Sequence, residues 1–321
     1  GERGFDEVFI HGGGGIGQKY PGSCADAPPN RENRYYDPAI RHNGSFVKTK
    51  GYCTDVFFRQ ALAWIEENKA RRFFAYITTN APHAPYICPE QYSAPYLDDA
   101  KDEAHAAFSG MITNIDENVG VLMAKLQEWK LEEGTLLIFM TDNGSAGSEF
   151  GGGMLGRKGD VNEGGTRVPL FFRWKGAIAE NRDIDTHSRH IDVLPTLCEI
   201  AQVSIPENLD GRSLMPLIED PNTVMPERMT FFHRGRWGKA NIKGRWSGEG
   251  PQAGRNVNFA VRTERFRLVG TNRLFDIDAD PGQTSNVFKD HPDITERLLG
   301  AYYQWWKNII YPLPLIERAG V

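Results

Sequence analysis

The sequence lacks the features that mark several classes of protein. Only four of its 321 residues are cysteine, which is too few for a disulfide scaffold, and no two are spaced as C-x-x-C for zinc or a redox dithiol. No apolar run approaches the roughly 18 residues that a membrane-spanning helix needs. The formal charge is −5, so there is no basic excess of the kind that binds nucleic acid or an acidic membrane surface.

What remains is the profile of a globular protein. The chain is 40% hydrophobic, 25% charged and 11% aromatic, and its length suits one large domain with an appendage or two domains. The opening residues 1–7 resemble neither a signal peptide nor a usual mature start. We therefore expect the chain to begin within a longer protein.

Helical periodicity and short apolar runs alternate in the first part of the chain. Apolar residues spaced as on one helix face predict helices over 54–72 and 102–131. Continuous apolar runs of strand length stand at 73–79, 135–140 and 168–174. This alternation predicts an α/β fold with an open, mixed or mostly parallel sheet that helices cover on both faces.

The pattern changes near residue 225. Separate strand patterns stand at 229–233, 259–269 and 273–277, and a helical pattern follows at 292–308. Strands grouped together before a helix are typical of an α+β unit with an antiparallel sheet. We predict an α/β domain over 1–224 and a small α+β subdomain over 225–321.

Polar side chains directly follow two of the predicted strands. His83 comes after the run 73–79, and Asp142 and Asn143 come after the run 135–140. If both strands run the same way, these residues share one edge of the sheet, where ligands bind in α/β folds. Carboxylate and amide oxygens suit a hard cation such as Ca²⁺ or Mg²⁺. Taken alone, Asp-Asn-Gly is more simply a turn, and a lone histidine between prolines is more often structural.

Two glycine-rich segments need separate interpretations. Residues 151–165 contain seven glycines in a loop, and backbone amides together with the Lys158 ammonium suit a tetrahedral oxyanion. Lys158 lacks the neighbours of a P-loop, and a flexible connector is the alternative. Residues 12–17 match G-x-G-x-x-G, but Pro21 arrives too soon for the helix that a dinucleotide site requires.

Six blocks, taken together and in order, resemble the formylglycine-dependent sulfatases of the alkaline phosphatase superfamily. They are spread over residues 80–282. The blocks are NAPHAPY at 80–86, TDNG at 141–144, RKGDVNEGGTRVP at 157–169, HIDVLPTL at 190–197, DGRSL at 210–214 and LFDIDADPG at 274–282.

The resemblance implies a function and a site. Asp142 and Asn143 resemble the C-terminal pair of ligands to an active-site Ca²⁺. Lys158 resembles the lysine that contacts the sulfate group, and His83 the histidine that contacts the sulfate and the leaving oxygen. The implied reaction is hydrolysis of a sulfate monoester of a glycan or a small aryl compound. Such enzymes are usually exported to the periplasm, the lysosome or the outside of the cell.

The sequence lacks three features of the family. The nucleophile motif C-x-P-x-R, whose cysteine becomes formylglycine, occurs nowhere in the chain. The family's early Asp-Asp metal pair and its Gly-Lys-Trp-His segment are missing too. All three stand upstream of residue 1 in the family's order. We therefore interpret the chain as the C-terminal portion of a sulfatase that is inactive by itself, with the formylglycine upstream.

Two other functions stay open. Phosphoester and phosphonate hydrolases of the superfamily tend to have histidine where Asn143 stands, so Asn143 favours sulfate and Ca²⁺. A non-catalytic polyanion- or carbohydrate-binding module is the second alternative. Substrate contacts are expected from the opening loop with Tyr35 and Tyr36 and from Arg236 and Lys243 in the cationic excursion 234–256, which a mobile solvated loop explains equally.

Overall fold

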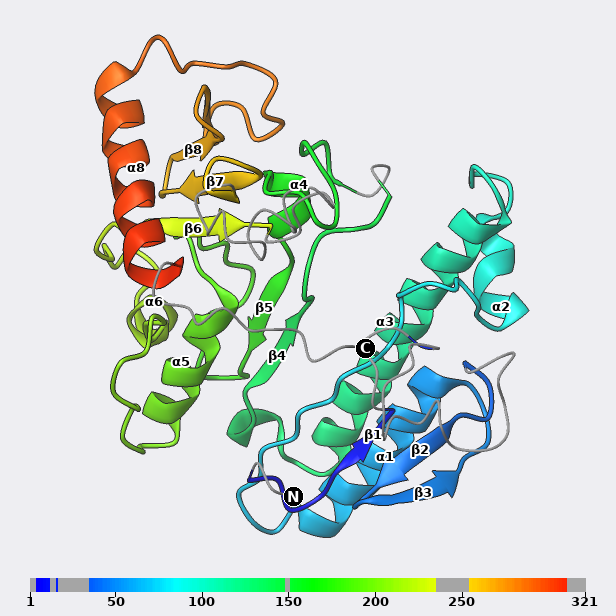
Figure 1. Ribbon diagram of the computed structural model, residues 1–321. Helices are drawn as coiled ribbons and strands as arrows, with labels where there is room; N and C mark the ends of the chain where they lie inside the picture. The colour runs from blue at the N-terminus through cyan, green and yellow to red at the C-terminus, as the bar shows by residue number, and fades with distance from the viewer. Residues whose placement is uncertain (1–3, 12–15, 17–34, 148–150, 235–253, 311–321) are drawn as a thin grey trace. The chain divides into compact units, whose positions relative to one another are not determined.

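The computed structural model describes residues 4–11, 16, 35–147, 151–234 and 254–310 (Figure 1). The chain forms two compact units, unit 1 over Gly1–Thr135 and unit 2 over Leu136–Val321. The domain boundary expected after residue 224 falls within unit 2 and stays a prediction.

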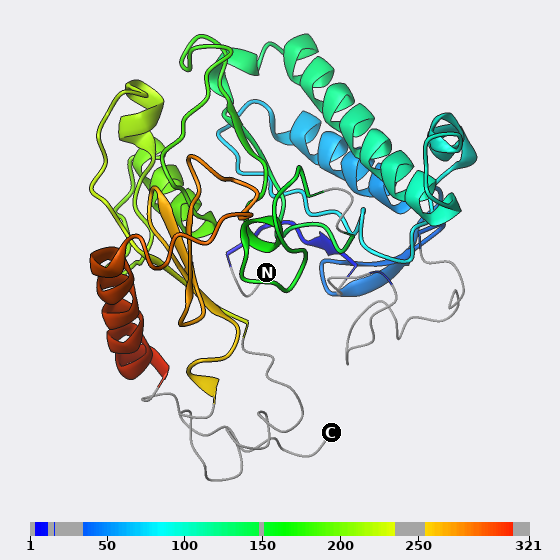
Figure 2. The ribbon, with the colours of Figure 1, turned by 90° about the horizontal axis from the view of Figure 1, so that it is seen from above.

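Unit 1 combines a small sheet with two long helices. Its three strands pair antiparallel in the order β1-β2-β3. Helices α1 and α3 lie side by side (Figure 2). The elements are β1 (Phe9–Ile10), β2 (Ala39–His42), β3 (Ser45–Lys48), α1 (Cys53–Asn68), α2 (Glu90–Ser93), η1 (Ala94–Tyr96), α3 (Glu103–Glu128) and η2 (Glu132–Gly134).

Helix α3 confirms the predicted periodicity. It begins where the Asp102 side chain accepts a hydrogen bond from the backbone N–H of His105 at 2.8 Å, which satisfies one of the free donors of the first turn. Phe108, Met111, Leu122 and Leu126 are buried on one face. The helix ends just before Lys130, whose φ of 58° is left-handed. Ile112 shares the apolar spacing of these residues but is 45% exposed.

A polar contact and an aromatic pair fix the interior of unit 1. The Asp55 carboxylate of α1 accepts hydrogen bonds from the amides of Asn114 and Asn118 of α3, both at 2.8 Å. The buried rings of Tyr35 and Tyr52 stack with centroids 5.7 Å apart. Packing of this kind adds to the burial of the rings, which is the larger stabilising contribution.

The strand predicted at 73–79 is not formed. Side-chain exposure alternates along this segment as it does in a strand, with Phe74 58% and Tyr76 64% exposed. The segment nevertheless pairs with no strand in the described residues. A strand requires a partner for its N–H and C=O groups, and apolar residues alone do not provide one.

Unit 2 begins with the elements that carry the candidate site. β4 and β5 pair antiparallel, with Met140 opposite Leu170. The ladders of the described residues are antiparallel, so the expected parallel pairing is not found among them. The elements are β4 (Leu137–Met140), α4 (Glu163–Thr166), β5 (Leu170–Arg173), η4 (His190–Asp192), α5 (Val193–Ile200) and α6 (Met215–Glu219).

The C-terminal strands form the expected antiparallel sheet in the order β6-β7-β8-β9. The run 259–269 divides into two strands at a tight turn. Helix α8 packs on this sheet (Figure 1), and the ring of Tyr302 stacks on Phe259 at 3.8 Å. The elements are β6 (Thr230–His233), β7 (Phe259–Arg262), β8 (Phe266–Val269), β9 (Arg273–Asp276), α8 (Pro292–Trp305) and the π-helical turn Trp306–Ile310.

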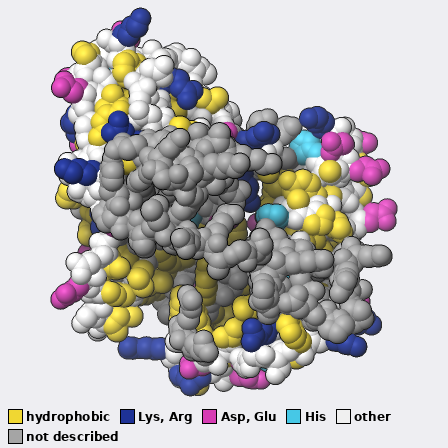
Figure 3. Space-filling view, viewed as in Figure 1, with side chains coloured by type: hydrophobic (Ala, Val, Ile, Leu, Met, Phe, Trp, Pro, Cys, Tyr) yellow, Lys and Arg dark blue, Asp and Glu magenta, His cyan; other side chains and the backbone are white. Residues whose placement is uncertain are grey.

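The surface carries charges of both signs. On the face in Figure 3, Lys and Arg side chains and Asp and Glu side chains are dispersed over the described part. Among the described residues, no helix has the length and apolar character needed to cross a bilayer.

Candidate functional site

Asp142 and Asn143 stand directly after β4, where the sequence predicts a cation site. The Asp142 side chain is exposed and that of Asn143 is half-buried. The Asn143 amide nitrogen donates to the carbonyl of Gly144 at 3.1 Å. Because the nitrogen is engaged in this way, the amide oxygen remains available as an acceptor beside the Asp142 carboxylate.

Gly144 lets the Asp142-Asn143 turn pack closely against the loop that carries Lys158. The backbone N–H of Gly144 donates to the carbonyl of Gly165 at 3.2 Å. A Cβ on Gly144 would lie 1.9 Å from the carbonyl oxygen of Gly164, so no other residue fits there without moving the backbone. A Cβ on Gly164 would lie 2.5 Å from the carbonyl oxygen of Gly156, and one on Gly165 would lie 2.4 Å from that of Asp160, so both glycines are required by the packing of the loop on itself.

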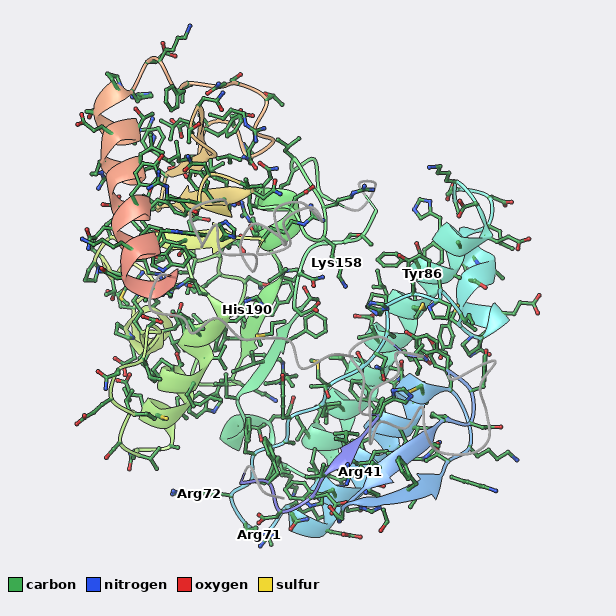
Figure 4. All side chains as sticks on the ribbon, in the orientation of Figure 1. Arg41, Arg71, Arg72, Tyr86, Lys158 and His190 are labelled. Carbon is green, nitrogen blue, oxygen red and sulfur yellow. The ribbon has the colours of Figure 1, made fainter. Side chains whose placement is uncertain are left out.

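Lys158 is brought to the same place by a second backbone contact. Its N–H donates to the carbonyl of Ser145 at 2.7 Å, which is three residues beyond Asp142. The Gly164 N–H closes the base of the loop on the Leu155 carbonyl at 2.8 Å. The Lys158 side chain is exposed and projects from the loop (Figure 4). The structure therefore brings together the loops that carry the two predicted metal ligands and the predicted sulfate-contacting lysine.

The Lys158 loop is anchored at Glu163, a residue without a predicted role. The Glu163 carboxylate oxygen Oε1 accepts from Nε of Arg262 at 3.0 Å and from Nε of Arg267 at 2.7 Å. Its backbone N–H donates to Gln283 at 2.8 Å. Burial would raise the pKa of Glu163, but the charges and hydrogen bonds of Arg267 and Arg262 outweigh it and hold the pKa below its usual value.

Arg267 also binds residues on both sides of Glu163 in the loop. Its guanidinium also donates to the Val161 carbonyl and, at 3.0 Å, to the Thr166 hydroxyl. Burial lowers the pKa of Arg267 to about 10, against the opposing effect of Glu163, so the group stays charged at neutral pH. A buried ion pair of this kind fixes geometry more than it adds stability. The sheet of β7 and β8 thus holds the loop that carries Lys158.

His190 is a second residue that was not singled out. Its Nε2 lies 2.8 Å from the carbonyl oxygen of Thr141, the residue before Asp142 (Figure 4). A carbonyl oxygen only accepts, so Nε2 carries the proton and donates. His190 was visible in the sequence only as part of the block 190–197. Its contact with β4 depends on a fold that brings residues 141 and 190 together.

His83 belongs to unit 1, and the structure shows how it is held there. The hydroxyl of buried Tyr35 donates to the His83 carbonyl at 2.6 Å, and the His83 N–H donates to Asn80 at 2.9 Å. The ring Nδ1 lies 2.7 Å from the carbonyl of Ala84, so Nδ1 carries the proton and Nε2 is left for a ligand. That His83 shares one edge with Asp142 stays a prediction.

The remaining residues expected to contact the substrate are two tyrosines and two basic residues. Tyr35 was expected in a substrate-facing loop, but its side chain is fully buried and belongs to the core of unit 1. This expectation was wrong because a tyrosine in an irregular stretch carries no periodic signal of burial. Tyr36 is half-buried. Arg236 and Lys243 lie outside the described residues and stay predictions.

The cysteines and the acidic and histidine side chains form no further metal site in the described residues. Cys88 and Cys198 are free thiols, the Cys53 thiol lies 4.0 Å from the Oδ1 oxygen of Asn80, and Cys24 lies outside the described residues. Within the described ranges, no three His, Cys, Asp or Glu side chains gather as a metal site. Asp142 and Asn143 fit two positions of an oxygen-rich shell, whereas Ca²⁺ takes about six to eight oxygens. The remaining ligands must then come from water, substrate or other residues.

Comparison with family models agrees with the sequence resemblance. Residues 1–203 match the model described as Sulfatase. Residues 157–300 match the model described as N-sulphoglucosamine sulphohydrolase, C-terminal. The first match covers more than half of the chain, and the second includes both the Lys158 loop and the C-terminal sheet.

Curated relatives are similar over parts of their length. The chain is 27% identical over 203 residues to the uncharacterized sulfatase YdeN of Escherichia coli, covering 60% of this chain and 36% of that protein. It is 25% identical over 266 residues to the N-acetylgalactosamine-6-O-sulfatase of Bacteroides thetaiotaomicron, covering 76% and 49%. The chain therefore spans at most about half the length of these two relatives.

Solved structures confirm the predicted fold. The crystal structure of Ps i-CgsB has a TM-score of 0.77 and 25% identity, and the match covers 97% of this chain and 68% of that chain. BT4656, solved in complex with its substrate D-glucosamine-2-N,6-O-disulfate, has a TM-score of 0.68 and 16% identity, covering 88% and 75%. A phosphonate monoester hydrolase from Silicibacter pomeroyi reaches 0.58 with 20% identity, covering 81% and 60%.

Proposed function

The chain belongs to the sulfatase family, and from this premise we propose that the protein hydrolyses sulfate monoesters of carbohydrates to an alcohol and inorganic sulfate. The proposal rests on the backbone contact between the Asp142-Asn143 turn and the Lys158 loop. The Gly144–Gly165 and Lys158–Ser145 hydrogen bonds bring the turn and Lys158 to one place. An anion held there would meet a cation site and an ammonium together.

Carbohydrate esters are favoured over small aryl sulfates by two similarities. The family model that matches residues 157–300 is named for an enzyme of N-sulphoglucosamine. The relative that covers 76% of the chain acts, by its name, on 6-O-sulfated N-acetylgalactosamine. We extend this substrate class, a sulfated amino sugar or a glycan that contains it, to the present protein.

The residues of the chain then take definite roles. In sulfate ester hydrolysis, negative charge moves onto the leaving oxygen as the S–O bond breaks. The Lys158 ammonium attracts the sulfate oxygens and stabilises this charge. In its doubly protonated form, His83 keeps the Nδ1 proton on the Ala84 carbonyl and donates the Nε2 proton to the departing alcohol. Tyr35 and Asn80 hold the His83 backbone in place through the contacts described above.

The family implies a metal ion and a formylglycine, and the donor chemistry leads us to propose Ca²⁺. Asp142 and Asn143 supply hard oxygens and no imidazole or thiolate, which suits Ca²⁺ better than zinc. A bound cation would neutralise charge on the sulfate group. The absence of histidine at 143 also favours sulfate over phosphoester or phosphonate substrates, whose enzymes are the second candidate.

The nucleophile is proposed to lie outside residues 1–321. The chain contains no C-x-P-x-R sequence, and none of its described cysteines stands in the Lys158 loop or the Asp142 turn. Residues 1–321 expressed alone should therefore bind sulfate esters without turning them over. Export to the periplasm, the lysosome or the cell exterior is proposed on family membership alone.

The test compares two classes of ester. The protein as its gene encodes it should release sulfate from N-acetylgalactosamine 6-sulfate with a kcat/KM about a hundredfold or more above that for the matching phosphate ester. Residues 1–321 alone should release none. Preference for phosphate would replace the proposal with the phosphoester hydrolase alternative. Turnover by residues 1–321 alone would contradict the proposed location of the nucleophile.

A further inference from the structure

Arg234 lies against the Lys158 loop, next to the lysine itself. Its guanidinium atoms Nε and Nη2 each lie 3.7 Å from the point where a Cβ on Gly159 would stand, and Cζ lies at 3.9 Å. Gly159 has a φ of +86° and no side chain, so no Cβ stands between its backbone, beside Lys158, and the guanidinium. Two cations of different shape therefore flank one glycine.

The C-terminal sheet holds Arg234 in this position. Arg234 directly follows β6, and its N–H donates to the carbonyl of Asn258 at 3.0 Å. β6 pairs with β7, and β7 with β8. Arg262 of β7 and Arg267 of β8 bind Glu163 in the same loop as Gly159. One hydrogen-bonded frame thus carries both Arg234 and the loop on which it rests.

The side chain of Arg234 is exposed, and no carboxylate in the described part of the chain forms an ion pair with it. A planar guanidinium binds sulfate or carboxylate through two parallel hydrogen bonds, whereas an ammonium acts as a point charge. Lys158 therefore suits the reacting sulfate, and Arg234 suits an oxyanion with a fixed orientation next to it.

We propose that Arg234 is a specificity-determining residue that binds a second anionic group of the substrate, close to the sulfate ester that is cleaved. This inference rests on the proposed function and narrows it to substrates with two neighbouring oxyanions. The second anion is a further sulfate on the same sugar or the carboxylate of an adjoining uronic acid. Both present paired oxygens to the fork of the guanidinium.

The experiment measures how strongly the protein prefers a sugar with two anionic groups over the same sugar with one sulfate. The gene product and its Arg234→Gln and Arg234→Lys variants are assayed on N-acetylgalactosamine 6-sulfate, on the 4,6-disulfate, and on a 6-sulfated disaccharide with a uronic acid. Binding of the same three sugars to residues 1–321 is measured by calorimetry. Arg273→Gln is the control, because Arg273 is an exposed arginine that begins β9, at the opposite edge of the sheet from β6.

We expect Arg234→Gln to lower the preference for one doubly charged sugar over the 6-sulfate by about tenfold, in kcat/KM and in affinity. Arg234→Lys should recover only part of it. The sugar whose preference falls identifies the second anion as sulfate or carboxylate. The inference is overturned if Arg234→Gln leaves the preference for both doubly charged sugars unchanged, or if Arg273→Gln lowers that preference equally. If the unmodified protein cleaves no sulfate ester, the proposed function fails, and the affinity ratio still decides the role of Arg234.

Discussion

Replacing Gly144 by alanine is expected to lower sulfate release by about a hundredfold or more, because misplacement of about 1 Å near reacting groups has an effect of that size. The new Cβ would lie 1.9 Å from the carbonyl oxygen of Gly164 and 2.9 Å from its carbonyl carbon. These are backbone atoms, so the Asp142-Asn143 turn and the Lys158 loop must separate. The strain should also destabilise unit 2 by about 1–3 kcal/mol.

A matched substitution separates this effect from a general intolerance of alanine. Gly300 lies in helix α8 of the same unit, and a Cβ there meets nothing within 4 Å. Gly300→Ala should therefore leave sulfate release unchanged and stabilise the helix by up to about 1 kcal/mol. Both variants are compared by kcat/KM and by denaturant unfolding. Wild-type kcat/KM in Gly144→Ala would mean that the close packing of the two loops has no catalytic importance.

The second large effect is expected at Glu163. Glu163→Gln keeps the shape of the side chain and removes its charge, which leaves two buried guanidinium groups without a counter-ion. Breaking a buried pair in this way destabilises proteins by about 3–5 kcal/mol. Because Arg262 and Arg267 no longer fix the loop, amide hydrogen exchange should rise across residues 155–166 before the rest of unit 2 unfolds.

An exposed pair of the same residue types provides the control. Glu227 binds Arg297 at 2.8 Å, but their side chains are 49% and 47% exposed, so Glu227→Gln should change stability by less than about 1 kcal/mol. Equal losses in the two variants would show that burial of the Glu163 pair does not matter.

The pH dependence of stability tests the interaction of Glu163 with Arg262 and Arg267 independently. The pKa of Glu163 is lowered in the folded protein, so its contribution is fully present above the unfolded value of about 4.3 and is lost as the pH falls through the folded pKa. Wild-type stability should therefore include an acid-sensitive component that Glu163→Gln lacks. The difference in unfolding free energy between the two proteins should shrink as the pH is lowered through this range.

Local patterns predicted the elements that depend on local signals. The apolar period of α3 and the strand patterns of the C-terminal sheet are carried by neighbouring residues, and both are confirmed. The segment 73–79 was predicted as a strand for the same reason. That prediction was wrong because hydrophobicity identifies an apolar segment but not the partner that a strand requires.

In the candidate site too, residues in local motifs could be predicted, whereas contacts between distant residues could not. Asp142, Asn143 and Lys158 could be proposed from the sequence because each stands in a short motif, and the backbone contacts of Gly144 and Lys158 bring these motifs together. Glu163 stands in a motif as well, but its partners are distant in the sequence. Arg262 and Arg267 lie 99 and 104 residues away from it, and no local pattern links residues across that separation.

The most direct test of the whole account is the rate of sulfate release from N-acetylgalactosamine 6-sulfate by the gene product with Lys158→Ala. Loss of one preorganised cationic donor to the transition state should lower kcat by about a hundredfold to a thousandfold. Lys289→Ala, which removes an exposed lysine of the same unit, should leave kcat unchanged. A Lys158→Ala variant with wild-type kcat would contradict the assignment of this loop to sulfate and, with it, the proposed site.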